Sequence, residues 1–198
     1  MTSDKQRLGY ALGLNIARNL QEQGFENFDF ASFTAALEDH YSNAELKMSV
    51  VEVNQTLQDS MARIQAEKHA PVLEQGRAFL KENAEREDVF VTESGLQYRI
   101  MKSGSGKSPR PTDRVTTHYH GKLIDGNVFD SSVNRGAPAT FPVNGVIQGW
   151  QEALPMMKEG DKWELVIPYD LAYGENGAGS AIPPFSTLIF EVELISVN

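Results

Sequence analysis

The sequence predicts an α+β protein, with an all-α helical arm first and then an antiparallel β-sheet wrapped on one short helix. Residues 1–88 contain only one of the nine prolines, Pro71, and are rich in Ala, Leu, Glu and Gln. Residues 89–198 hold the other prolines, twelve of the sixteen glycines and both tryptophans. Apolar residues recur at helical spacing in the first part and alternate with polar residues in the second. We therefore expect a domain boundary near residue 88.

The first helix is predicted over residues 4–22, where Leu8 and Leu12 begin a stripe of apolar residues spaced four apart. Gly9 and Gly13 share this spacing. Glycine inside a helix costs about 1 kcal/mol relative to alanine, so two of them need a reason. A face of small residues lets a second helix approach closely, which is the reason we favour.

Two further helices follow in the arm. The second is predicted over residues 29–41, with Asp29 as its N-cap. The third runs from about residue 49 to 86 and opens with Ser49 and Glu52 in a capping-box pattern. The second helix carries apolar residues at Phe30, Phe33, Leu37 and Tyr41, and the third is predicted from its helical composition.

The length of the third helix decides how the arm is interpreted. At ~1.5 Å per residue it would reach roughly 55 Å, and we expect a kink or break near His69–Pro71. Three helices of which one is so long bury little core alone, so a simple cap or linker is one interpretation. We favour a dimerisation arm: residues 1–45 of two chains interlock, and the helix over 49–86 is a spacer.

Residues 89–198 predict the β domain. Alternation of polar and apolar residues predicts strands over 95–101, 115–123, 162–168 and 187–196. Asp125 and Gly126 form a hairpin-turn signal. Residues 147–157 have helical spacing and end at a glycine, which predicts the one short helix. A single helix against an antiparallel sheet is an α+β layering.

Composition excludes several classes of function. The chain has no cysteine, which excludes disulfides, thiolate metal sites and a cysteine nucleophile. Its formal net charge of −9 makes binding to nucleic acid or to an anionic membrane a poor expectation. The first twenty residues lack the apolar core of a signal peptide, and no segment is apolar enough to cross a bilayer. We expect a cytoplasmic protein, or a periplasmic one if a leader has been removed.

The motifs of common enzymes are missing from the sequence. It contains no zinc-protease, nucleophile-elbow, phosphate-loop or dinucleotide-binding pattern. His118 and His120 would share one face of a strand, but no third ligand is evident nearby, so we predict no metal site and no cofactor. Asp130 lies in a turn-like segment, where a structural role in the turn is the simplest interpretation.

Large apolar residues gather instead at strand ends and in loops rich in Gly and Pro. Loops normally lie on the surface, so such side chains suggest a shared apolar pocket. The candidates are Tyr119, Phe129, Phe141, Val146, Ile147, Trp150, Tyr173, Ile182 and Phe190.

The order of these residues resembles the FKBP family of peptidyl-prolyl cis-trans isomerases. The motifs that carry the resemblance are 117–123, 125–132, 146–150, 171–174, 182–184 and 188–194, and they span most of the second half. With the helical arm in front, the chain resembles the bacterial Mip-like branch, and within it the cytoplasmic FKBPs of this chain's size of 22.0 kDa. The resemblance implies an FKBP-like isomerase domain over 89–198 and a homodimer joined by the arm.

The resemblance also implies a role for each site residue. Trp150 would lie under the substrate proline, while the Ile147 N–H and the Tyr173 hydroxyl would bind substrate carbonyls. Asp130 would face the carbonyl of the isomerising bond, with Arg135 beside it. The implied catalytic set is Asp130, Tyr173, Ile147, Tyr119 and Trp150. The implied substrate-binding set is Tyr119, Phe129, Arg135, Phe141, Val146, Ile147, Trp150, Ile182 and Phe190.

Two departures from the family pattern affect selectivity. Ala139 stands where many relatives have a pocket aromatic, and Ala178 where some carry a histidine. The implied partners are unfolded or partly folded proteins with X–Pro bonds, macrolide inhibitors of the family and a second copy of the chain, with chaperone activity of the dimer. The alternative is a binding module, a holdase or scaffold that grips proline without turnover.

Overall fold

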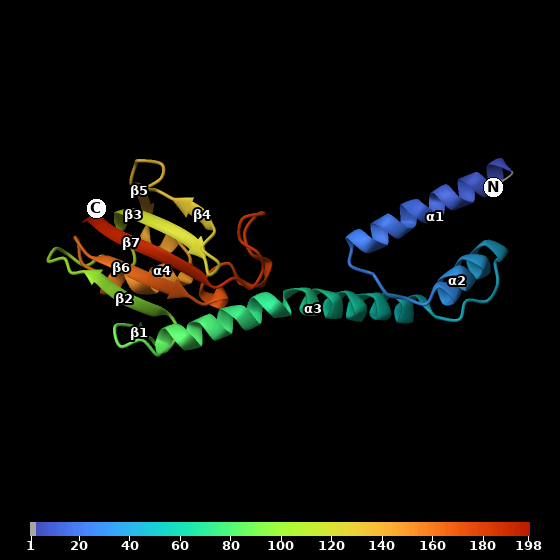
Figure 1. The fold of residues 1–198 in the computed structure, drawn as a ribbon, viewed down its shortest axis with the longest axis horizontal. Coiled ribbons are helices and arrows are strands. Elements are labelled where there is room, and N and C mark those ends of the chain that lie inside the picture. Colours follow the sequence, from blue (N-terminus) through green and yellow to red (C-terminus); the bar gives the residue numbers. More distant parts are fainter. Residues whose placement is uncertain (1–2) are drawn as a thin grey trace. The chain divides into compact units, whose positions relative to one another are not determined.

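The structure is a computed structural model that describes residues 3–198, and it has the predicted class, with helices first and an antiparallel sheet after them (Figure 1). Packing divides the chain into two compact units, one up to Lys68 and one over His69–Asn198. The composition changes near residue 88 instead. The two positions differ because the second half of the long helix packs with the sheet. No described helix has the length and hydropathy needed to span a membrane.

The first unit begins with α1 (Asp4–Glu22) and α2 (Phe30–Ser42), as predicted. The hydroxyl of Ser3 caps α1, and the Asp29 carboxylate accepts the Ser32 N–H at 2.6 Å to cap α2. Neither helix buries a single residue within the described chain. The apolar faces of both helices are therefore open.

The long helix is α3 (Val50–Ala84). Its capping box is confirmed, because the Ser49 hydroxyl accepts the Glu52 N–H at 3.3 Å and the Glu52 carboxylate accepts the Ser49 N–H at 2.8 Å. Pro71 lies inside the helix without ending it. The break considered at Pro71 does not occur, and the residues that follow it continue as helix to Ala84.

One seven-stranded antiparallel sheet forms the second unit within the described chain (Figure 1). Its strands are β1 (Phe90–Val91), β2 (Gln97–Lys102), β3 (Arg114–Leu123), β4 (Val128–Ser131), β5 (Ala139–Pro142), β6 (Lys162–Ile167) and β7 (Leu188–Val197). Their order is β1-β2-β6-β7-β3-β4, with β5 paired to β3. Four of these strands were predicted, whereas β1, β4 and β5 have only two to four residues and show no clear alternation.

The short helix is α4 (Gln148–Ala153), continued by a 3₁₀ turn over Leu154–Met156. Trp150 and Ala153 join the buried core together with residues of β6 and β7. Gly149 permits this approach, since a Cβ there would lie 2.5 Å from the Ile167 side chain. The β3–β4 turn is also as predicted, with Gly126 at a φ of 90°. The sheet and α4 therefore pack against the same hydrophobic core.

Candidate functional site

A cavity of about 600 Å³ opens between α4, four strands (β3, β4, β5 and β7) and the loop over residues 171–182. The residues around it come from segments far apart in the sequence and are mostly apolar or aromatic. They are Tyr119, Phe129, Asp130, Phe141, Gly145, Val146, Ile147, Trp150, Tyr173, Ala178, Ala181, Ile182 and Phe190. A concave apolar site with few polar groups is typical of a binding or active site.

Trp150 lines the cavity and is itself buried. Its indole meets the ring of Phe190 at a centroid distance of 5.2 Å and an angle of 82°, and the ring of Tyr119 at 5.5 Å and 84°. Phe141 packs on its remaining side at 5.4 Å. Edge-to-face contacts are favourable for aromatic rings, so these four side chains hold one another in fixed orientations before any ligand arrives.

A glycine in β3 makes room for two of the rings. A Cβ on Gly121 would lie 2.6 Å from the ring of Phe190 and 2.8 Å from that of Phe129. These two rings meet edge to face at 5.4 Å. Since no real Cβ tolerates such distances, the packing of this wall requires glycine at position 121.

The polar side of the cavity is centred on Asp130. The Tyr119 hydroxyl donates a hydrogen bond to Asp130 Oδ2 at 2.5 Å, and the Arg135 guanidinium pairs with Oδ1. Arg135 also donates to the Tyr119 hydroxyl at 2.9 Å and lies 5.6 Å from the centre of that ring. Three side chains therefore fix the carboxylate at the edge of an apolar cavity.

This arrangement sets the ionisation of the site. Burial opposes ionisation of Asp130, but the hydrogen bonds from Tyr119 and Arg135 outweigh it and hold the pKa of Asp130 below its usual value. Burial raises the pKa of Tyr119, and the hydrogen bond to Asp130 adds to the effect. Burial and the charge of Asp130 likewise raise the pKa of Tyr173. At neutral pH the site thus holds one carboxylate and two protonated phenols.

Several hydrogen-bond donors of residues that line the cavity have no partner within the described residues, and one of them, Trp150 Nε1, is buried. Among residues 3–198, nothing accepts the Ile147 N–H or the Tyr173 hydroxyl proton. Ile147 lies at the N-cap of α4 with an extended backbone. The Gln151 side chain donates to the Val146 carbonyl at 2.6 Å and so holds the segment before the helix. The Ile147 N–H and the Tyr173 hydroxyl can therefore each donate a hydrogen bond to a carbonyl oxygen of a ligand.

Comparison with known proteins identifies the family. The family described as FKBP-type peptidyl-prolyl cis-trans isomerase matches residues 105–195, and the domain described as amino-terminal to it matches residues 5–100. The chain is 49% identical over 191 residues to the FKBP-type 22 kDa peptidyl-prolyl cis-trans isomerase of Escherichia coli, covering 95% of this chain and 93% of that protein. The chain belongs to the FKBP-type peptidyl-prolyl cis-trans isomerase family.

Further members of the family match over the whole chain. The peptidyl-prolyl cis-trans isomerase Mip of Coxiella burnetii is 41% identical over 211 residues, which cover 100% of this chain and 89% of that protein. The crystal structure of FkpA from Escherichia coli matches with a TM-score of 0.67 and 36% identity, covering 100% of this chain and 98% of that one. The likeness therefore includes the helical arm as well as the FKBP domain.

In this FKBP, all the predicted site residues except Arg135 line the cavity, and Arg135 lies behind Asp130. Gly145, Ala181 and the positioning residue Gln151 were not predicted, because small or polar residues give no apolar signal. Of the two departures, Ala178 lines the cavity and Ala139 is not among its lining residues.

The two histidines of β3, His118 and His120, each contact a serine hydroxyl. His118 Nδ1 lies 3.0 Å from the Ser132 hydroxyl, and His120 Nδ1 lies 2.9 Å from the Ser131 hydroxyl. These contacts join β3 to the segment at the end of β4. Within residues 3–198 of this FKBP, no group of three or more acidic or histidine side chains is arranged to hold a metal ion.

Proposed function

We propose that the chain binds the proline of an X–Pro segment in the cavity above Trp150 and lowers the barrier to rotation about the preceding peptide bond. Membership of the FKBP-type family makes it a peptidyl-prolyl cis-trans isomerase. The single observation that supports this use of the cavity is the packing of three aromatic rings on Trp150, beside the unpartnered Ile147 N–H and Tyr173 hydroxyl.

The reaction needs no bond to be broken. Rotation about an amide has a barrier of about 18–20 kcal/mol, because resonance keeps the C–N bond planar. The planar amide is the more dipolar form, so removing it from water raises its energy more than that of the twisted amide. The apolar lining of the cavity favours the twisted amide in this way, and each 1.36 kcal/mol gained corresponds to about tenfold in rate.

The polar groups of the cavity would add to this preference for the twisted amide. The Ile147 N–H and the Tyr173 hydroxyl hold the carbonyls of the flanking chain, which keeps the proline ring fixed over Trp150. Asp130 carries a negative charge at the edge of the cavity, held by Tyr119 and Arg135. This charge opposes the partial negative charge on the carbonyl oxygen of the planar amide, and rotation of that carbonyl relieves the repulsion.

The test separates an isomerase from a binding module that only grips proline. Asp130→Ala removes the charge but leaves the aromatic cage. We expect turnover of an X–Pro peptide, measured by line-shape exchange in NMR, to fall more than the affinity for the same peptide. Equal losses of turnover and affinity would favour the binding module. A matched control is Asp125→Ala, which removes a carboxylate of the β3–β4 turn that does not line the cavity.

The arm supports a second proposal, a homodimer through residues 1–45. Leu8 is 62% exposed and Phe30 70% exposed, although both are large and apolar. A Cβ on Gly9 or Gly13 would meet nothing within 4 Å, so nothing in the chain itself requires a glycine there. A helix of a second copy packing on this face would explain both observations.

The clients that we propose are unfolded or partly folded proteins. Val50, Val51 and Leu57 expose apolar side chains along the first half of α3, which suits contact with non-native chains and chaperone activity of the dimer. The volume of the cavity suits a drug-sized ligand, so binding of macrolide inhibitors is part of the proposal. Cytoplasmic localisation stays a prediction. Cell fractionation with an antibody to the chain would test it.

A further inference from the structure

One wall of the cavity belongs to a loop that hydrogen-bonds to itself. Ala178 and Ile182 exchange two backbone hydrogen bonds, at 2.8 Å and 3.1 Å, and both residues line the cavity. The Phe185 N–H donates to the Gly174 carbonyl at 3.0 Å and closes the loop over residues 174–185. Backbone hydrogen bonds therefore tie this loop together at two places, one of them at the cavity.

The outer end of this loop is strained. Phe185 has a φ of 61°, in the left-handed region that a bulky residue rarely adopts. Its ring packs against Tyr169 at a centroid distance of 5.2 Å and against His69 of α3 at 5.8 Å. Strain of this kind persists only where the surroundings hold the residue, and here α3 provides one side of the support.

A second contact joins the same helix to the end of the loop. Gly76 is buried in α3, and a Cβ on it would lie 2.6 Å from Thr187 Oγ1 and 3.4 Å from Thr187 Cβ. Thr187 is buried and immediately precedes β7. Glycine destabilises a helix interior relative to alanine, so close approach to Thr187 is the physical reason for glycine at this position.

We propose that α3, through His69 and Gly76, positions the loop over residues 174–185 and the adjoining Thr187, and with them one wall of the proline cavity. His69 and Gly76 act as positioning residues, since neither lines the cavity. The helix that forms the arm would then also set the shape of the site, and displacement of its second half would loosen substrate binding. The expected change in substrate binding rests on the proposed function, whereas the expected change in the loop does not.

The first test is Gly76→Ala in the full chain. The added methyl pushes Thr187 away, so amide hydrogen exchange at Ala178, Ile182 and Phe185 should accelerate about tenfold or more, while amides of β3 and β7 keep their protection. The KM for an X–Pro peptide should rise severalfold with little change in kcat.

The double variant Gly76→Ala/Thr187→Ala provides the rescue. It removes the Oγ1 that the new methyl meets, so the exchange rates and the KM should return toward those of the parent chain. A double variant no better than Gly76→Ala overturns the proposal, because the loss would then not arise from contact with Thr187.

His69→Ala is the second variant, and it keeps the proposal testable if Gly76→Ala unfolds. It deletes one ring beside Phe185 in a helix that tolerates alanine well. We expect faster exchange at Phe185 and a higher KM, while the matched exposed control Glu74→Ala changes neither. If amide exchange in the loop of the His69→Ala chain is unchanged, the inference is wrong, whatever the activity of the parent chain. If the parent chain has no isomerase activity, the proposed function is wrong instead.

Discussion

Tyr173 offers the cleanest residue-scale test of how substrate is held. Its hydroxyl lines the cavity and has no partner among the described residues, so Tyr173→Phe removes one hydrogen bond to substrate and none within the protein. A net hydrogen bond contributes about 0.5–1.5 kcal/mol, so kcat/KM for an X–Pro peptide should fall about twofold to tenfold. Thermal unfolding should be unchanged. A large loss of stability would show that the hydroxyl has a structural role.

The ionisation of the site leads to a prediction on pH. The pKa of Asp130 is lowered and those of Tyr119 and Tyr173 are raised, so none of the three changes charge between about pH 5 and 9. The kcat/KM of the parent chain should therefore be nearly constant over this range.

At acid pH, the lowered pKa of Asp130 determines how stability and activity change. The hydrogen bonds to the Asp130 carboxylate stabilise the folded state above the unfolded pKa, and this contribution is lost as pH falls through the lower folded value. Activity should therefore fall only on the acid side of the usual carboxyl range. A bell-shaped profile centred near pH 7 in the peptide assay would contradict this assignment, since none of the residues lining the cavity is a histidine.

Residues of the site were predictable where they carry a strong chemical signal. Trp150, Phe190 and the other apolar residues stood out because they lie in or next to loops, where large side chains are unusual. Gln151 acts through one hydrogen bond, and Gly121 acts through the absence of a Cβ atom. Such roles depend on distances across the fold, which a single sequence does not contain.

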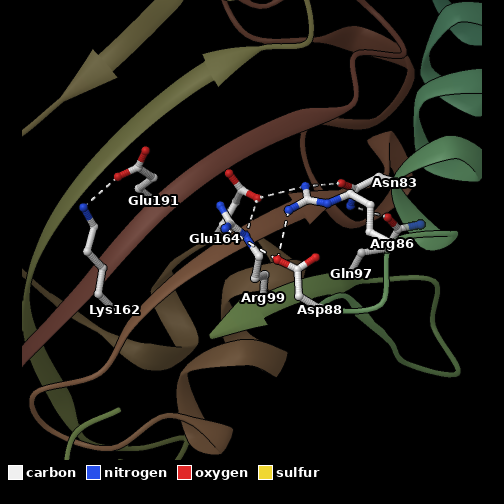
Figure 2. Close-up of polar contacts among 8 residues, drawn as sticks. All are labelled: Asn83, Arg86, Asp88, Gln97, Arg99, Lys162, Glu164 and Glu191. Carbon is white, nitrogen blue, oxygen red and sulfur yellow. Dashed lines mark hydrogen bonds and ion pairs between the residues drawn. The ribbon is translucent and has the colours of Figure 1, made fainter. Parts of the chain in front are cut away.

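At the scale of elements, a polar cluster joins the end of α3 to the sheet (Figure 2). The buried Asn83 side chain donates to Gln97 Oε1 at 2.8 Å, and Gln97 Nε2 donates to the Leu80 carbonyl at 2.8 Å. Around them, Arg86 and Arg99 pair with Glu164 and Asp88, as Figure 2 shows. The partly exposed ion pairs contribute little, so we expect the buried amide pair to dominate.

Asn83→Ala tests this assignment. It leaves Gln97 Oε1 buried without its donor, which should lower the free energy of unfolding of the β unit by about 1–3 kcal/mol. Asn54→Ala is the matched control, because the Asn54 side chain is exposed in the first half of the same helix and contacts no polar partner among residues 3–198. Urea unfolding followed by tryptophan fluorescence measures both changes. Equal effects of the two substitutions would mean that helix propensity, not the amide pair, decides stability.

The elements themselves were predicted in proportion to their length. The N-caps of α2 and α3 were predicted from the sequence, and the bounds of α1, α2 and α3 fall within two residues of the prediction. β4 and β5 are short and depend on pairing with β3, which is a tertiary contact. Local patterns cannot show a strand that exists only because a longer neighbour accepts its hydrogen bonds.

At the scale of the whole molecule, the exposed face of α1 leads to a prediction on assembly. The full chain should sediment at twice its mass of 22.0 kDa. Leu12→Glu introduces a charge on this face, and Leu12 is 56% exposed in the single chain, so the substitution should dissociate the dimer without unfolding α1. Activity on a short peptide should stay unchanged. A parent chain that sediments as a monomer would contradict the dimer.

Two chains shortened from the amino terminus separate the roles of the two halves of α3. A chain of residues 69–198 keeps the whole second unit, whereas a chain of residues 89–198 loses the helix that contacts Phe185, Thr187 and Gln97. Composition alone would place the cut near residue 88, but packing places it at 68/69. We expect the longer fragment to keep the peptide kcat/KM within about twofold.

The shorter fragment should melt at lower temperature and show a raised KM, because it leaves buried polar groups of the sheet without partners and frees the loop beside the cavity. Neither fragment should assist the refolding of a proline-limited protein as well as the full chain does, since both lack the proposed dimer and the exposed face of α3. Thermal unfolding, the peptide assay and a refolding assay measure the three effects. If the two fragments behave alike in the first two assays, the second half of α3 does not support the site, and the helix serves the arm alone.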